Sequence, residues 1–252
     1  MNRKDAIRLQ KIIADSGYCS RRKAEAYIER GLVKVNGRTA TLGDKANPAR
    51  DVITVDGKTM KRKDTPRYIK LYKPRGYVCT MSDPHAADGK LITDLLKKTD
   101  ITQRVYPVGR LDANSEGLIL LTNDGAFANR IAHPANEYSK VYRVTVSGKV
   151  TEAQLAQLSA GVEIEGDGKP YRTRPCIVDV ATAEEKRTVL LFTIVEGKNR
   201  QVRRMCAAMG LNVTRLKRTS IGGVKLGMLA QGEYADLTHQ ELRLLGHEQN
   251  KC

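Results

Sequence analysis

The chain has 252 residues, enough to bury a sizeable core as one large domain or as a small and a medium one, and no low-complexity segment or internal repeat is present. No apolar run approaches the length of a membrane span, and the five scattered cysteines have neither zinc-site nor disulfide-framework spacing. The sequence therefore predicts a soluble cytoplasmic protein with reduced thiols and with no metal or other cofactor.

The positive charge is concentrated near the N-terminus. The net charge is +16, and residues 1–75 alone carry 20 Lys and Arg against 8 Asp and Glu. Such an excess favours a polyanionic partner whose binding weakens with salt, although a merely solvated basic surface is the alternative. This asymmetry favours two domains.

The first 60 residues are predicted to form two helices followed by two strands. Apolar spacing places a first helix before Gly17, and Ser20 opens a second that Gly31 closes. Residues 33–35 alternate before an Asn-Gly turn, and residues 53–55 precede an Asp-Gly turn. Three cations in the first turn of the second helix are unfavourable there unless an anion such as a phosphate approaches.

The segments 8–11, 19–25 and 31–37 resemble the small RNA-binding domain first described in ribosomal protein S4. That family usually has Asp at the place of Gln10, which we interpret as a surface helix position. The resemblance implies structured RNA as a partner. The candidate RNA contacts are Arg8, Lys11, Ser20, Arg21, Arg22, Lys23, Lys34 and Asn36.

We expect an α+β protein with residues 1–64 as the small helix-helix-strand domain, 58–67 as a linker, 68–245 as the larger domain and 246–252 as a tail. Strands are predicted at 68–72, 105–111, 118–121, 141–146, 176–180, 188–195 and 213–216. Helices are predicted at 127–131, 151–159 and 201–209, with a last one capped by Thr238 and Glu241. Strands outnumber helices, which indicates a mixed, largely antiparallel sheet with packed helices.

One loop sets a carboxylate in a polar turn directly before a buried strand. Asp112 lies in the segment 109–125, whose residues 118–121 read as a core strand. From the turn alone, a capping role is the more common one for such an aspartate.

Three segments resemble the motifs of RNA pseudouridine synthases. The first is Arg-Leu-Asp with Ser115 and Gly-Leu following, the second is Lys-Val-Tyr ending at Tyr142, and the third is the Asn-Arg-Gln-Val-Arg-Arg-Met of residues 199–205. Without the resemblance, Tyr142 would be a core tyrosine on a strand face and the cations at 198–204 a solvated helix face. The match is best to the branch that modifies ribosomal RNA and carries an S4-type domain.

The resemblance implies a role for each candidate. Asp112 would act on the ribose, either by attacking C1′ or by taking the C2′ proton. Arg203 would pair with Asp112 and keep it ionised, and Tyr142 would stack on the uracil. Arg110 would fill the vacancy left by the flipped uridine, and Leu216, Arg200 and Lys198 would bind the substrate.

Two other functions remain open from the residues. An RNA N-glycosylase would use Asp112 and Glu116 as a pair of carboxylates, and a non-catalytic ribosome-assembly factor would use both domains only to bind RNA.

The favoured substrate is a stem-loop of large-subunit ribosomal RNA bound by a monomer. Residues 221–223 and 232–234 also resemble the enzymes of the small subunit.

Overall fold

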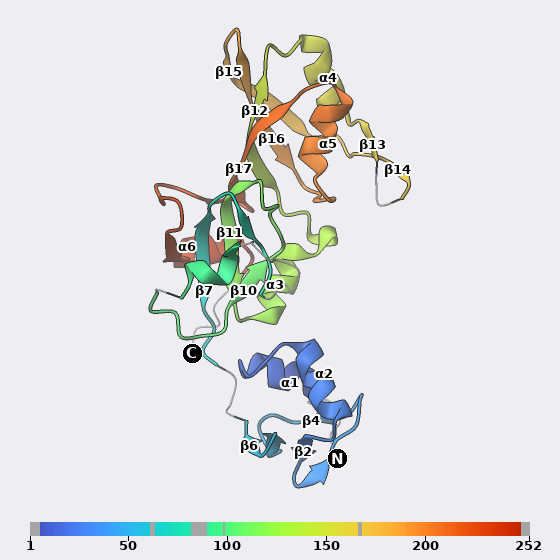
Figure 1. The fold of residues 1–252 in the computed structure, drawn as a ribbon, viewed down its shortest axis with the longest axis vertical. Helices are drawn as coiled ribbons and strands as arrows, with labels where there is room; N and C mark the ends of the chain where they lie inside the picture. The colour runs from blue at the N-terminus through green and yellow to red at the C-terminus, as the bar shows by residue number, and fades with distance from the viewer. Residues whose placement is uncertain (1–5, 61–63, 82–89, 98, 166–167, 248–252) are drawn as a thin grey trace. The chain divides into compact units, whose positions relative to one another are not determined.

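The computed structural model describes residues 6–60, 64–81, 90–97, 99–165 and 168–247. The chain divides into two compact units. Unit 1 comprises Met1–Arg67 with Ile101–Val105 and Asn123–Gly125, and unit 2 comprises Tyr68–Asp100, Tyr106–Thr122 and Ala126–Cys252. Each unit has its own set of helices and sheets (Figure 1).

Unit 1 combines two short helices with a small antiparallel sheet. The helices are α1 (Leu9–Asp15) and α2 (Arg21–Glu29), and the sheet has the order β3-β2-β5-β6. The strands are β2 (Val33–Val35), β3 (Arg38–Thr39), β5 (Ile53–Val55) and β6 (Lys58–Thr59), and a separate pair is formed by β1 (Ile7–Arg8) and β4 (Lys45–Ala46). The apolar faces of both helices and of β2 and β5 form one core.

The local signals of unit 1 act as predicted. Ser20 caps α2 by accepting a hydrogen bond from the backbone N–H of Lys23. Asn36 and Gly37 both have positive φ, 50° and 83°, which is the conformation of a tight hairpin between β2 and β3.

Two expectations for unit 1 are wrong. The predicted linker 58–67 begins with β6, which pairs with β5 through Val55 opposite Lys58, because an edge strand of two residues needs no apolar pattern. Gln10 is 8% exposed and its amide nitrogen donates to Glu25, so it lies between the helices and not on the surface. Residues 61–63 of the predicted linker lie outside the described residues.

Unit 2 is built on one nine-stranded sheet with the order β15-β16-β12-β17-β11-β7-β19, to which β10 and β18 add at β11 and β17. The strands are β7 (Tyr68–Lys73), β10 (Tyr106–Val108), β11 (Glu116–Thr122), β12 (Lys140–Ser147), β15 (Ile177–Ala183), β16 (Arg187–Ile194), β17 (Val213–Ile221), β18 (Val224–Lys225) and β19 (Tyr234–Asp236). Only the β11–β17 pair in this sheet is parallel. The mixed, largely antiparallel sheet of an α+β fold is confirmed.

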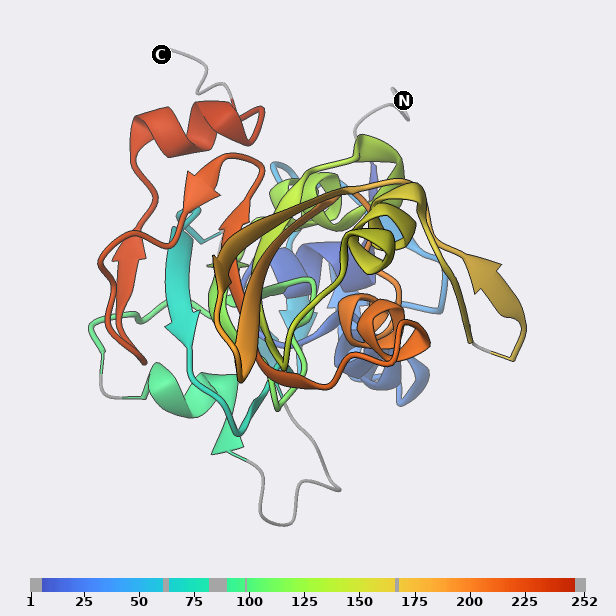
Figure 2. The same ribbon diagram turned by 90° about the horizontal axis from the view of Figure 1, so that it is seen from above.

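The helices of unit 2 pack on this sheet. They are α3 (Gly125–Ala132), α4 (Glu152–Ala160), α5 (Gln201–Ala208) and α6 (His239–Leu244), with 3-10 turns η2 (Ile92–Leu95) and η3 (Pro134–Asn136). Thr151 with Gln154 and Thr238 with Glu241 form the predicted capping boxes. Figures 1 and 2 both show α4 and α5 on the same face of the sheet. Two small pairs complete the unit, β8 (Tyr77–Val78) with β9 (Lys90–Leu91) and β13 (Glu163–Glu165) with β14 (Pro170–Arg172).

Two strand boundaries differ in ways that affect the site. The strand predicted over 105–111 ends at Val108, because Gly109 turns the chain with a φ of 75°. The strand predicted over 213–216 continues to Ile221, since it lies between β12 and β11 and is hydrogen-bonded to both. The first difference frees the segment 109–115 as a loop, and the second carries Arg218 into the centre of the sheet.

Removing residues 1–64 is expected to leave a folded unit 2. The nine-stranded sheet and the core of α3, α6 and β11 contain no residue from this segment. Circular dichroism of the 65–252 fragment should show a cooperative thermal transition. An insoluble fragment or a broad transition would show that unit 2 needs the N-terminal residues to fold.

Candidate active site

A pocket opens in unit 2 where β12, β17 and the loop before β11 come together with the start of α5. Its lining includes Arg110, Asp112, Tyr142, Arg203 and Leu216, five of the seven side chains that the sequence assigned to catalysis or substrate binding. The other two, Lys198 and Arg200, line it as well. The antiparallel β12–β17 pair and the parallel β17–β11 pair bring these segments together although they lie up to 106 residues apart.

Asp112 is at the first position of a tight turn. The N–H of Ser115 donates to the carbonyl oxygen of Asp112 at 3.0 Å, and Ser115 itself is fully buried. The carboxylate remains 35% exposed and faces the pocket. The turn thus fixes the backbone while leaving the carboxylate accessible.

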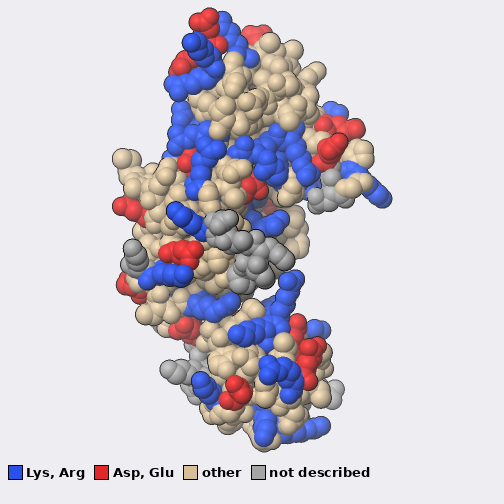
Figure 3. Space-filling model, in the orientation of Figure 1, with Lys and Arg blue, Asp and Glu red and all other residues tan. Residues whose placement is uncertain are grey.

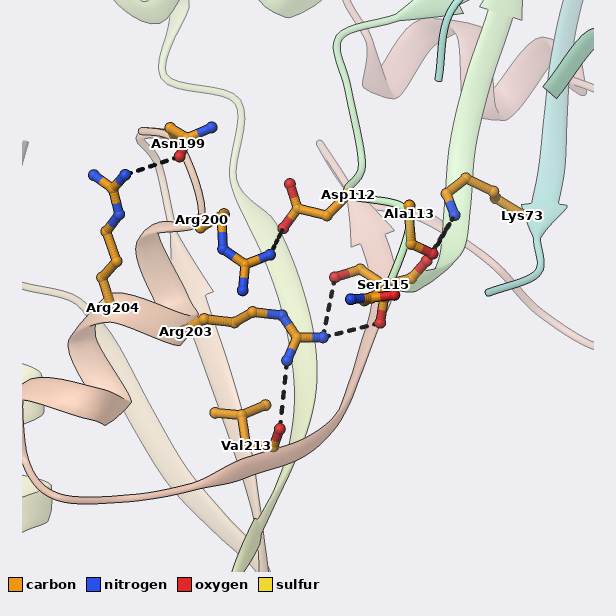
Figure 4. Close-up of polar contacts among 10 residues, drawn as sticks. Lys73, Asp112, Ala113, Ser115, Asn199, Arg200, Arg203, Arg204 and Val213 are labelled. Atoms are coloured by element: carbon orange, nitrogen blue, oxygen red, sulfur yellow. Dashed lines mark hydrogen bonds and ion pairs between the residues drawn. The ribbon is translucent and has the colours of Figure 1, made fainter. Parts of the chain in front are cut away.

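Two cations, the buried Lys73 and the half-buried Arg203, hold the remaining carbonyl groups of this turn. The ammonium of Lys73, at the end of β7, donates to the carbonyl of Ser115 at 2.7 Å and to that of Ala113 at 3.4 Å. The guanidinium of Arg203 donates to the carbonyl of Asn114 at 2.9 Å (Figure 4). Because hydrogen bonds from charged donors are the stronger ones, both side chains restrict where Asp112 can lie.

The ion pair with Asp112 comes from Arg200 and not from Arg203, which corrects the pairing that the resemblance implies. Nη1 of Arg200 lies 3.7 Å from Oδ2 of Asp112, and Figure 4 shows the two side chains pointing toward each other. Arg200 precedes α5 with φ 51° and ψ 29°, a left-handed conformation that non-glycine residues rarely adopt. The side chain of Arg200 lines the pocket.

Arg203 acts on Asp112 through the turn. Its three hydrogen bonds go to the carbonyls of Asn114 and Val213 and to the hydroxyl of Ser115. Burial, and next the neighbouring charge of Arg200, lower the pKa of its guanidinium from the ordinary value, which still leaves an arginine charged.

Tyr142 forms one wall of the pocket. It lies on β12 opposite Arg218 of β17 and is 8% exposed, on the same face as the buried Val144 and Val146, as the alternation predicted. A ring in this position presents its aromatic surface to any planar group that enters.

The remaining candidates differ in their surroundings. Leu216 is a buried wall residue, and Arg110 is exposed at the rim. Lys198 also lines the pocket, with its ammonium 4.7 Å from the ring centre of Tyr171.

The candidate RNA contacts of unit 1 fall into two groups. Three have structural partners: Ser20 caps α2, Lys11 pairs with Asp15 at 2.6 Å, and the Asn36 side chain bonds Asp51 and the backbone of Val52. The others are exposed cations, Arg8, Arg21, Arg22, Lys23 and Lys34. The exposed set is the one free to meet phosphate.

Three residues of the site were missed by sequence reasoning. Lys73 and Arg218 are buried, and Lys140 lines the pocket next to Tyr142 with its pKa lowered by burial and by the charge of Arg218. For Lys73 the sequence did offer a signal. It ends the largely apolar run Tyr-Ile-Lys-Leu-Tyr-Lys of the buried strand β7, and a lysine is rarely buried without a partner.

Other acids near the loop are engaged elsewhere. Glu116 is 1% exposed, is paired with Arg215 and does not line the pocket. Glu196 lines it, but its oxygens accept hydrogen bonds from Tyr171, Gln201 and the backbone of Arg174. The two-carboxylate arrangement that a glycosylase needs is therefore not formed by Asp112 and Glu116.

Replacing Lys73 with methionine is expected to lower the free energy of unfolding by about 2 kcal/mol at pH 7, because carbonyls of the turn lose their donor. Burial lowers the pKa of Lys73 to about 8, against about 10.4 in an unfolded chain. At pH values between these two pKa values, the unfolded chain binds one proton more than the folded chain. The free energy of unfolding of the parent therefore rises with pH. Denaturant titrations from pH 7 to 10 should show the gap between the parent and Lys73→Met widening; a gap that stays constant contradicts the assignment. Lys149→Met, at an exposed lysine, is the control.

Within the described ranges, no helix is long and apolar enough to span a membrane, and no group of three His, Cys, Asp or Glu side chains is placed to bind a metal ion.

Comparison with known proteins agrees with this site. Residues 67–208 match the RNA pseudouridylate synthase family and residues 7–52 match the S4 domain. The chain is 44% identical to an uncharacterized RNA pseudouridine synthase of Aquifex aeolicus, over 95% of this chain and 93% of that protein. It is 42% identical to ribosomal large subunit pseudouridine synthase B of Bacillus subtilis, over 94% and 95%.

Two further matches extend the comparison. The chain is 41% identical to the dual-specificity RNA pseudouridine synthase RluF of Escherichia coli, over 94% of this chain and 77% of that one. A crystal structure of a pseudouridylate synthase superposes with a TM-score of 0.67 at 32% identity, covering 95% of this chain and 99% of that one. The family match covers more than half of the chain, and its motifs meet in one pocket. The chain belongs to the RNA pseudouridine synthase family and carries an S4 domain.

Proposed function

We propose that this protein converts one or two neighbouring uridines of large-subunit ribosomal RNA to pseudouridine, with Asp112 as its single catalytic carboxylate. The observation that carries this proposal is the contrast between the two carboxylates that line the described pocket, Asp112 and Glu196. Glu196 accepts hydrogen bonds from Tyr171 and Gln201, whereas within the described residues the Asp112 carboxylate accepts no hydrogen bond and pairs with Arg200. Arg200 forms an ion pair with it, and Lys73 and Arg203 fix its turn. Those are the conditions that a nucleophile or base acting on the ribose requires.

The charge distribution supports an RNA stem-loop as the substrate. Figure 3 shows Lys and Arg side chains gathered over the part of unit 2 where β17 and α5 lie. Unit 1 adds its own exposed cations, Arg21, Arg22 and Lys23, in the first turn of α2. Binding should be strongly salt-dependent, and short single strands should be poor substrates.

The choice of large-subunit RNA rests on the named relatives. The Bacillus subtilis protein is a large-subunit enzyme and is aligned over almost its full length.

Mapping pseudouridines in ribosomal RNA from a strain lacking this protein tests the target. Carbodiimide labelling and primer extension should show one lost site, or two neighbouring ones, in large-subunit RNA, restored by the intact gene. A loss confined to small-subunit or transfer RNA refutes the target. Loss of nothing, together with inactivity of the purified protein on large-subunit transcripts, refutes the proposed function.

Tyr142→Phe is expected to keep at least about a tenth of the parent kcat, whereas Tyr142→Ala loses about 100-fold or more. The ring is the buried wall of the pocket, and its stacking on a base is worth about 1–3 kcal/mol. Single-turnover kinetics on the mapped RNA measures both. An equal loss in the two variants would assign the function to the hydroxyl instead of the ring.

A further inference from the structure

Arg218 is a buried cation that lines the pocket and has one unpartnered donor. It lies on β17, is 3% exposed and lines the same pocket as Asp112 and Tyr142. Its Nε donates to the carbonyl of Leu118 at 2.8 Å and its Nη1 to that of Arg110 at 3.4 Å. Its Nη2 is buried and has no hydrogen-bond partner.

The surroundings leave this charge without a carboxylate. In the described part of the chain, no acid lies within ion-pair distance of Arg218, and Asp112 pairs with Arg200. Lys140 adds a second cation, and burial and then the charge of Arg218 lower the pKa of its ammonium. Buried apolar side chains, among them Ile194 and Ile221, form the adjacent lining.

An unpartnered N–H of a buried cation is energetically unfavourable, because the group has lost its water without gaining a protein acceptor. The guanidinium is also held rigidly, since two carbonyls from β11 and from the loop before Asp112 fix two of its three nitrogens. A rigid, desolvated donor on a residue that lines a pocket is suited to an acceptor that arrives with the substrate.

The depth of Arg218 decides which part of a nucleotide it meets. The Asp112 and Arg200 side chains are 35% and 46% exposed, whereas Arg218 is 3% exposed beside Tyr142 at 8%. In a bound RNA the phosphates stay on the backbone at the mouth of the pocket, whereas the flipped base enters the pocket most deeply. The acceptors of uracil are its carbonyl oxygens.

We propose that Nη2 of Arg218 donates a hydrogen bond to a carbonyl oxygen of the flipped uracil and stabilises the negative charge that the base acquires during the reaction. As the C1′–N1 bond breaks, its electron pair stays on the uracil and spreads from N1 onto the carbonyl oxygens. The pair is used again when C5 bonds to C1′, and N1 takes up a proton as C5 loses one. No co-reactant is consumed.

This inference rests on the proposed role of Asp112, and the experiment separates the two. Full-length Arg218→Met and the parent are compared on a synthetic stem-loop around the mapped site, carrying uridine, 2-thiouridine or 4-thiouridine at the target. Sulfur is the poorer acceptor. With one of the two thio substrates, kcat of the parent should fall about tenfold more than kcat of Arg218→Met falls with the same substrate.

On the uridine substrate, Arg218→Met should lower kcat by about 10²–10³-fold, as removal of one donor to a developing oxyanion does elsewhere, with the RNA Kd within a few fold. Arg187→Met, at an exposed arginine paired with Glu184, should retain the parent kcat. Thermal melting establishes that each variant is folded. If Arg218→Met does not fold, Arg218→Lys, which keeps the charge and loses the planar fork, is used in the same comparison.

Three outcomes overturn the inference. One is a folded variant with the parent kcat. Another is an equal fall in kcat on thio substitution in the parent and in Arg218→Met. The third is loss of the Arg218 effect when the phosphate of the target nucleotide is replaced by a methylphosphonate, which would assign Arg218 to the phosphate. A parent that is inactive on large-subunit RNA, or an active Asp112→Asn, would instead refute the proposed function.

Discussion

Asp112→Asn is expected to lower kcat by at least about 10⁴-fold while the Kd for RNA changes by no more than a few fold. The amide is nearly isosteric with the carboxylate, and the backbone bond from Ser115 that forms the turn does not involve the side chain. RNA affinity is dominated by phosphate contacts made by other residues. Single-turnover assays with carbodiimide detection, and filter binding on the same RNA, measure the two quantities.

The matched control is Asp179→Asn, at an exposed aspartate of β15 outside the pocket. It should leave both kcat and Kd unchanged. Measurable turnover by purified Asp112→Asn, free of parent enzyme, would remove Asp112 from the mechanism.

Gly117→Ala is expected to destabilise unit 2 by about 4 kcal/mol or more, or to prevent folding. Gly117 lies on β11 opposite Arg218 in the parallel β11–β17 pair, with a φ of 107°. A Cβ at this position would lie 2.2 Å from the carbonyl oxygen and 2.8 Å from the nitrogen of Arg218. Both contacts are with backbone, so relief requires moving β17 away from β11 and with it one wall of the pocket.

Gly148→Ala separates this clash from the cost of a positive φ. Gly148 has a φ of 77°, and nothing lies within 4 Å of a Cβ built there, so we expect a loss of only about 1–2 kcal/mol. Denaturant unfolding of both variants measures the difference. Equal losses at the two glycines would show that the strands tolerate the side chain.

Local chemistry explains which elements the sequence predicted well. Capping boxes at α4 and α6, the cap of α2 and the Asn-Gly turn depend on residues within a few positions of one another. The core strands β11, β12 and β16 were visible because buried strands carry long apolar or alternating patterns. The short strands β6 and β19 were missed, since their ends are set by pairing with a neighbour.

The sequence by itself determined the family, the two-part organisation and the identity of Asp112 and Tyr142 as candidates, because motif order and spacing are properties of the chain. Only the tertiary structure decided which arginine pairs with Asp112. Arg200 and Arg203 are three residues apart. Arg200 precedes α5 in a left-handed conformation and its guanidinium lies at the carboxylate, whereas the guanidinium of Arg203 reaches the turn. Likewise, Lys73 and Arg218 gained their roles from β7, β11 and β17 lying side by side. Burial, which gives both cations their energetic weight, is a property of the packed sheet.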